Sequence, residues 1–118
     1  MEMEIIEIGR IRIALLISDR IISKTQDVLE IMSESLSHNC YSIILYEKQI
    51  APDFFVLKSG IAGEMLQKFS LYDFRLAIIG DFSKYASKSL RDFIFESNKH
   101  RRINFVSSVE EAKERLIK

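Results

Sequence analysis

The stretch Ile11-Arg12-Ile13-Ala14-Leu15-Leu16-Ile17 decides the fold class of this chain. Its apolar run is nearly continuous, which is typical of a strand that is buried on both sides within an α/β sheet. An earlier apolar run, Met3 to Ile8, precedes it, and only Gly9-Arg10 separates the two runs. Such a short link between two strand-like runs predicts a β-hairpin. We therefore expect one antiparallel strand beside a central strand.

Helix-like and strand-like segments alternate along the rest of the chain. Ser23 and Gln26 have the spacing of a capping box, and apolar residues then recur at helical spacing as far as His38. The later helices are expected from Ser59 to Tyr72, from about Ser87 to Lys99 and from Ser108 onward, and the later strands at Ser42–Tyr46, Phe74–Gly80 and Ile103–Val106. The order β-β-α-β-α-β-α-β-α predicts a single α/β domain over residues 1–118, with a mixed, mostly parallel sheet of about five strands and four helices.

The composition excludes several classes of protein. The chain has 118 residues, of which 47% are hydrophobic and 29% are charged, as is ordinary for one globular domain. One cysteine and two histidines are too few for a disulfide framework or a zinc finger, so we expect no metal and no cofactor. No apolar run approaches the ~20 residues that span a bilayer, and the first residues lack the basic start of a signal peptide. These features predict a cytoplasmic protein that does not contact a membrane.

The net charge is zero because 17 basic side chains balance 17 acidic ones. This balance argues against a polybasic protein, and we expect no specific nucleic-acid partner. Residues 1–57, however, carry 5 basic and 9 acidic side chains, whereas residues 58–118 carry 12 basic and 8 acidic ones. The two halves are therefore oppositely charged. This leaves room for a local anion-facing surface, or for head-to-tail contact between two copies in a homodimer.

Four blocks of sequence resemble the domain-of-unknown-function 4180 family. They are Pro52–Glu64, Gly80–Tyr85, Ser87–Ile94 and Asn104–Ser108. With the segments between them these blocks extend over much of the chain. The resemblance implies a bacterial, cytoplasmic protein, and it implies no particular reaction.

The order of elements also resembles that of STAS domains, the fold of anti-sigma-factor antagonists. Those domains carry an Asp-Ser-Ser-Gly motif at the start of the helix after their third strand, and a partner kinase phosphorylates its second serine. Here Leu57-Lys58-Ser59-Gly60 occupies that place, so Ser59 and Gly60 match the last two positions. Leu57 replaces the aspartate and Lys58 the first serine. The resemblance implies a STAS-like fold in which Ser59 is the switch.

Ser59 is the residue on which the leading functional hypothesis depends. At a helix start its hydroxyl can accept hydrogen bonds from backbone amides, and a phosphate there would face the positive end of the helix dipole. The simpler alternative is that Ser59 only caps the helix and that the phenylalanine pair belongs to the core. We expect a non-enzymatic regulatory or protein-interaction module with a protein partner, whose partner or switch surface comprises Ser59, Lys58, Gly60, Phe54 and Phe55.

The loop after the Phe74–Gly80 strand supports an alternative function. Ligand sites of open α/β sheets lie at the carboxyl ends of strands, and the Asp81–Lys88 loop begins at such an end. The simpler alternative is a polar loop with a capping serine. No nucleophile is paired with a base, so no catalytic residue is assigned. A small anionic-ligand-binding protein or an enzyme would use this loop, with Ser83, Lys84, Ser87 and Lys88 round the anion. A third hypothesis is that the basic cluster Lys99-His100-Arg101-Arg102, with Arg91 two helical turns before it, binds an anionic partner.

Overall fold

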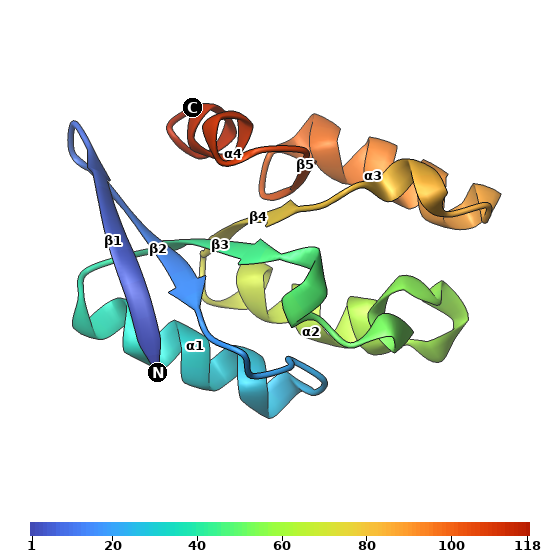
Figure 1. Cartoon of the computed structure of the whole chain (residues 1–118), viewed down its shortest axis with the longest axis horizontal. Coiled ribbons are helices and arrows are strands. Elements are labelled where there is room, and N and C mark those ends of the chain that lie inside the picture. Colours follow the sequence, from blue (N-terminus) through green and yellow to red (C-terminus); the bar gives the residue numbers. More distant parts are fainter.

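Five strands lie side by side in their sequence order in the computed structural model, which describes residues 1–118 (Figure 1). Strand β1 (Glu2–Ile8) pairs antiparallel with β2 (Ile11–Ile17), and the remaining pairs are parallel. The other strands are β3 (Ser42–Tyr46), β4 (Arg75–Ile79) and β5 (Ile103–Val106), and the helices are α1 (Thr25–Ser37), α2 (Ile61–Leu71), α3 (Lys88–His100) and α4 (Val109–Leu116). The predicted hairpin, element order and mixed sheet are confirmed.

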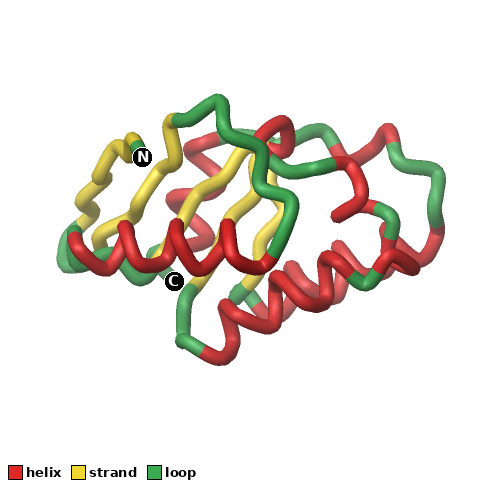
Figure 2. Tube along the Cα trace, turned by 90° about the horizontal axis from the view of Figure 1, so that it is seen from below, coloured by secondary structure: helices red, strands yellow, loops and turns green.

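Helices cover both sides of the sheet, but unequally (Figure 2). On one side α1, α2 and Leu90 of α3 pack against alternate strand residues such as Ala14, Ile43 and Ile78. On the other side only α4 is present, and it packs chiefly on β4 and β5. The middle of β2 contributes to both cores, because Ala14 and Leu16 face one and Ile13 and Leu15 face the other. This explains its continuous apolar run.

The carboxyl ends of all four helices lie at the edge of the sheet where the parallel strands begin, and arginines from that edge bind them. Arg12 Nε donates to the carbonyl of His38 after α1 at 2.9 Å. Arg102 donates to the carbonyls of Phe69 in α2 and Phe74 after it, at 3.4 and 3.0 Å. The last carbonyls of a helix have no partner within it, and they carry the negative end of the helix dipole. Arginines therefore suit these carbonyls, because they supply both a hydrogen-bond donor and a positive charge.

Arg75, the first residue of β4, joins the ends of two helices. Its guanidinium donates to the carbonyl of Arg101 after α3 at 2.7 Å, and to those of Arg115 and Leu116 in α4 at 2.8 Å each. The side chain thereby links the helices on opposite sides of the sheet to the strand between them.

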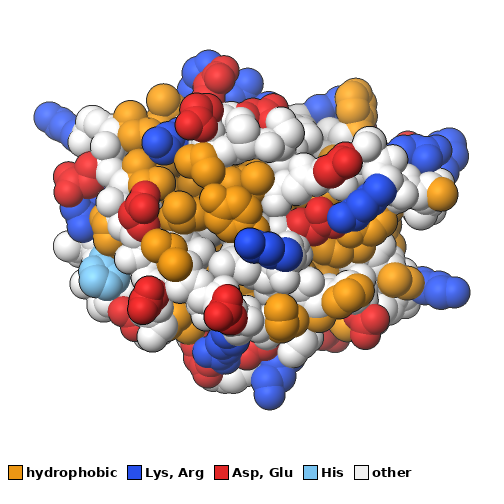
Figure 3. All heavy atoms as spheres, in the orientation of Figure 1, with side chains coloured by type: hydrophobic (Ala, Val, Ile, Leu, Met, Phe, Trp, Pro, Cys, Tyr) orange, Lys and Arg blue, Asp and Glu red, His pale blue; other side chains and the backbone are white.

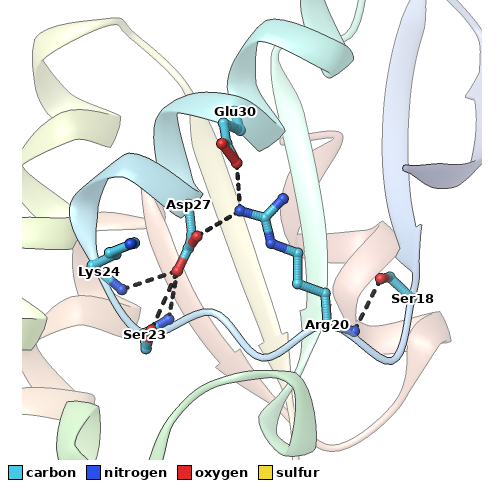
Figure 4. A network of polar contacts seen from close by, with 6 residues as sticks. All are labelled: Ser18, Arg20, Ser23, Lys24, Asp27 and Glu30. Atoms are coloured by element: carbon cyan, nitrogen blue, oxygen red, sulfur yellow. Dashed lines mark hydrogen bonds and ion pairs between the residues drawn. The ribbon is translucent and has the colours of Figure 1, made fainter.

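The expected capping box of α1 is wrong in its members. The helix begins at Thr25, and the residue that caps it is Asp27, whose carboxylate reaches back to the amides of Ser23 at 2.9 Å and Lys24 at 3.2 Å (Figure 4). Arg20 donates to the same carboxylate at 2.6 Å and also binds Glu30. Burial acts to raise the pKa of Asp27, but the hydrogen bonds from Ser23, Arg20 and Lys24 outweigh it and lower the pKa. A carboxylate displaces the expected serine and glutamine because it accepts several bonds at once.

None of the four helices combines the length and apolar composition needed to cross a lipid bilayer.

We expect Arg75→Gln to lower the free energy of unfolding by about 1–3 kcal/mol, because the half-buried hydrogen bonds to the carbonyls of Arg115 and Leu116 lose their donor. Urea unfolding followed by circular dichroism measures this. Arg10→Gln, in the exposed hairpin turn, is the matched control and should change stability by less than about 0.5 kcal/mol. Equal stability of the two variants would contradict the linking role of Arg75.

Candidate functional site

Three connections gather at the opposite edge, where the parallel strands end. They are residues 18–24 after β2, 47–60 after β3 and 80–87 after β4. The buried side chain of Gln49 ties the first two together: it donates to the carbonyls of Leu16 at 3.0 Å and Ser18 at 3.2 Å, and it accepts from the amide of Tyr46 at 2.8 Å. A β-bridge between Ile22 and Ile50 adds to this link. This edge, where open α/β sheets bind ligands, is therefore well ordered by its own contacts.

A cluster of Glu47, Lys84 and Tyr85 occupies this edge between β3 and β4. Lys84 Nζ lies 2.8 Å from Glu47 Oε2, and the Tyr85 hydroxyl donates to the same oxygen. Burial, then the hydrogen bond to Glu47 and the charge of Glu47, raise the pKa of Tyr85, so its hydroxyl keeps its proton. Beside the cluster lies a concavity of about 460 Å³, whose walls include Ile21, Lys48 and Phe55. The cluster holds two loops together by charge and hydrogen bonding.

Glu47 was missed by the sequence analysis, although a signal for it exists. It directly follows the buried strand β3, and a carboxylate at the end of a parallel strand is a reasonable site candidate. Its partners come from a loop more than thirty residues later, and only the parallel pairing of β3 with β4 brings them together.

The polar groups of the Asp81–Lys88 loop are bound mostly to neighbours within the chain. Asp81 accepts from the amide of Ser83 at 3.1 Å and from its hydroxyl at 2.6 Å, and these bonds lower the pKa of Asp81. Ser87 caps α3 by accepting from the amide of Leu90 at 3.2 Å. Lys88 lies 2.8 Å from Asp92. The loop is thus the polar loop with a capping serine that the sequence offered as the alternative to an anion site.

The residues predicted to bind anions do not form one site. Arg91 on α3 donates to the carbonyl of Ala86 at 2.9 Å, near the loop. Arg101 and Arg102, however, directly precede β5 and therefore lie at the edge where the strands begin. The loop candidates and the Arg101–Arg102 cluster are therefore two separate places, with α3 running between them.

Ser59 lies one residue before the cap of α2. The helix begins at Ile61, and its N-cap is Gly60, with a left-handed φ of 80°. The Ser59 hydroxyl donates to the carbonyl of Asp53 at 2.9 Å and accepts from the amide of Ile61 at 3.3 Å. The expected helix start at Ser59 is therefore two residues too early, because Ser59 still belongs to a turn of 3₁₀-helix (Leu57–Ser59) that precedes the helix.

The expected partner surface around Ser59 is divided by burial. Lys58, Ser59 and Gly60 are exposed. Phe54 and Phe55 are only 2% and 5% exposed and belong to the core, with their rings in edge contact at 4.9 Å. The expectation that either ring is an exposed apolar contact for a partner is therefore wrong. The turn Pro52–Phe55 directs both rings inward onto α2 and Tyr85.

Comparison with known proteins identifies a family. A model of the family described as "Domain of unknown function (DUF4180)" matches residues 9–116. The chain belongs to this family. Searches of curated proteins and of solved structures found no match. The DUF4180 match spans all four sequence blocks from which the resemblance was drawn and confirms it, whereas the likeness to STAS domains stays a prediction.

The side chains with the chemistry of a nucleophile are poorly placed for catalysis in this DUF4180 domain. Cys40 is fully buried, and burial raises the pKa of its thiol. Tyr85 donates to a carboxylate instead of giving up its proton. No group of three or more His, Cys, Asp and Glu side chains is arranged to hold a metal ion.

We expect Gly80→Ala to lower the free energy of unfolding by about 1–3 kcal/mol, because the new methyl group overpacks the cluster. A Cβ atom at Gly80 would lie 2.5 Å from Glu47 Oε1 and 2.7 Å from Glu47 Cβ. Gly63→Ala is the matched control, since nothing lies within 4 Å of a Cβ atom at this position in α2.

The control should raise the free energy of unfolding by about 0.5–1 kcal/mol, because alanine is the better helix former. Chemical unfolding of the two variants measures both effects. If they change stability in the same direction, Glu47 does not pack against Gly80 as described.

Proposed function

We propose that this protein is a non-enzymatic interaction module that binds a second copy of itself through the open side of its sheet. The observation that carries the proposal is a group of exposed and half-buried apolar side chains on β1, β2 and the end of β3, on the side of the sheet where α4 packs chiefly on β4 and β5. Figure 3, in the orientation of Figure 1, looks toward the β1 edge of the sheet and shows apolar side chains between α4 above and α1 below.

The apolar surface consists of residues that alternate along the first strands. Ile17 and Ile11 of β2 are 47% and 37% exposed, and Ile6 and Ile8 of β1 and Tyr46 of β3 are half-buried around them. Ile13 and Leu15, between them on the same face of β2, are buried, so the exposed apolar side chains stand at the two ends of this strand. A single exposed isoleucine is ordinary on a protein surface, but several apolar side chains on one face favour a binding surface. Two sheets can pack face to face at a separation of about 10 Å with their side chains interdigitated.

Charges beside this surface favour a second copy as the occupant. Glu2 and Glu4 of β1 are exposed on the same side of the sheet as Ile17 and Leu15, with which they are in register. Lys48, which follows β3 on the other flank, is exposed and lies 5.8 Å from the Tyr46 ring centre. A two-fold axis lying in the contact plane would bring the acidic flank of each copy to the basic flank of the other. Such a surface is self-complementary, as a symmetric dimer requires.

The remaining parts of the functional hypothesis fit this proposal. We place the module in the cytoplasm, where a lone thiol such as that of Cys40 stays reduced. We also propose a regulatory role like that of STAS domains, with Ser59 as the switch. Support for this comes from the exposure of Ser59 and from its hydrogen bond to the carbonyl of Asp53, which phosphorylation would remove.

We expect sedimentation velocity to find a dimer of the 13.7 kDa chain, and Ile17→Lys to convert it to a monomer by burying a charge in the contact. Leu71→Lys is the matched control, because Leu71 is 63% exposed on α2, on the opposite side of the sheet. This control should remain dimeric.

A charge exchange tests the symmetry of the contact. Glu4→Lys and Lys48→Glu should each weaken the dimer, and the double variant should restore it, because the two residues would meet across the axis. A monomeric wild-type chain, or a double variant weaker than both single ones, would overturn the proposed arrangement.

For the regulatory part, we expect a fraction of the protein isolated from its native cytoplasm to carry one phosphate on Ser59. Peptide mass spectrometry before and after phosphatase treatment measures this fraction. Ser59→Ala should abolish the modification, whereas Ser70→Ala, an exposed serine on α2, should keep it. Unmodified Ser59 under all growth conditions would leave it a purely structural residue.

A further inference from the structure

A concavity of about 530 Å³ opens at the edge where the parallel strands begin, and Ile11 of the proposed dimer contact lies on its wall. It lies between the starts of β3 and β4 and the ends of α3 and α4. Its volume lies within the range of small-molecule sites in proteins. The walls include Tyr41, Ser42, Asp73, Arg75, Arg101 and Arg102.

Positive charge predominates in this concavity. Three guanidinium groups, those of Arg75, Arg101 and Arg102, face one carboxylate, that of Asp73. Asp73 lies 3.2 Å from Arg102, but its side chain is 89% exposed, so water screens the pair. Lys118 also lines the concavity and has its own partner, Glu114, at 3.6 Å. The surplus of two positive charges has no counterpart in the chain.

The hydrogen bonds of Arg75 satisfy its donors without neutralising its charge. All of its acceptors are backbone carbonyls, which carry only partial charges. Burial, followed by repulsion from Arg101, Arg102 and Arg115, lowers the pKa of Arg75. An anion in the concavity would relieve this repulsion.

Arg101 is the donor that remains free for such an anion. Within the chain only its backbone carbonyl is bonded, and its guanidinium donates to nothing and joins no ion pair. The residue adopts the left-handed conformation after α3, with φ 61°, where glycine or asparagine is the usual choice. The backbone alone therefore gives no reason for an arginine here.

We propose that this concavity binds a small phosphate monoester, with its phosphate against Arg101 and its organic part near Tyr41. A phosphate monoester carries close to two negative charges at neutral pH, which matches the surplus. The planar guanidinium of Arg101 suits bidentate binding of phosphate oxygens. Tyr41 is 58% exposed and presents an aromatic ring to the same space. The site shares Ile11 with the proposed dimer contact, but none of its arginines belongs to that contact.

Titration of the ¹⁵N-labelled chain with phenyl phosphate, followed by NMR, tests the proposal. We expect saturable shifts of the amides of Ser42, Arg101 and Arg102, and no such shifts with phenol, which lacks the phosphate. Arg101→Asn tolerates the left-handed backbone and should weaken binding by roughly tenfold or more. Arg101→Lys should lose less, because it keeps the charge. Lys58→Asn, at the opposite edge, should bind like the wild type.

Two outcomes would overturn the proposal. One is equal binding by Arg101→Asn and Lys58→Asn, which would mean that phenyl phosphate finds the surface charge in general. The other is that a single-stranded oligonucleotide binds at these residues with steep salt dependence while phenyl phosphate does not, which would assign the surface to nucleic acid.

Discussion

The capping of helix ends by arginines at one edge of the sheet is the interaction on which the architecture depends. Strands that run parallel with helical connections bring every helix carboxyl end to the edge where the strands begin, so unpaired carbonyls collect there. Arg12, Arg75 and Arg102 stand in or directly before β2, β4 and β5, and each reaches a helix end from its strand. The same residues fix the strand, its flanking helix and their relative position.

This arrangement places the arginines that bind helix carbonyls at one edge of the sheet. At the opposite edge the backbone groups without a partner are amides. There the helices begin, and carboxylates suit their amide ends: Asp27 binds the amides before α1, and Glu111 that of Ser107 before α4. Both preferences follow from the direction of the helices, whose dipoles all run along the strands.

Much of the fold was predictable because its signals are local. The apolar run of β2, the two-residue hairpin link and the serine before α4 each act within a few residues, and each agrees with the structure. What could not be predicted depends on contacts between distant segments. Glu47 meets Tyr85 only through the pairing of β3 with β4, and the burial of Phe55 depends on Tyr85 as well. The prediction for the cap of α1 was wrong for a related reason. Asp27, and not a serine, accepts the hydrogen bonds at the start of this helix, and it is held there by Arg20, which lies outside the helix.

Strand β1 has a consequence for how the chain behaves in concentrated solution. It forms the edge of the sheet and carries Glu2, Glu4 and Glu7, whereas β2 behind it is apolar on both sides. Like charges and a lack of apolar continuity make β1 a poor template for further strands, while a bare edge of β2 would be a good one. The hairpin therefore protects the central strand from edge-to-edge aggregation. Of its two strands, β1 lies ahead of the family match at residues 9–116 and β2 lies within it.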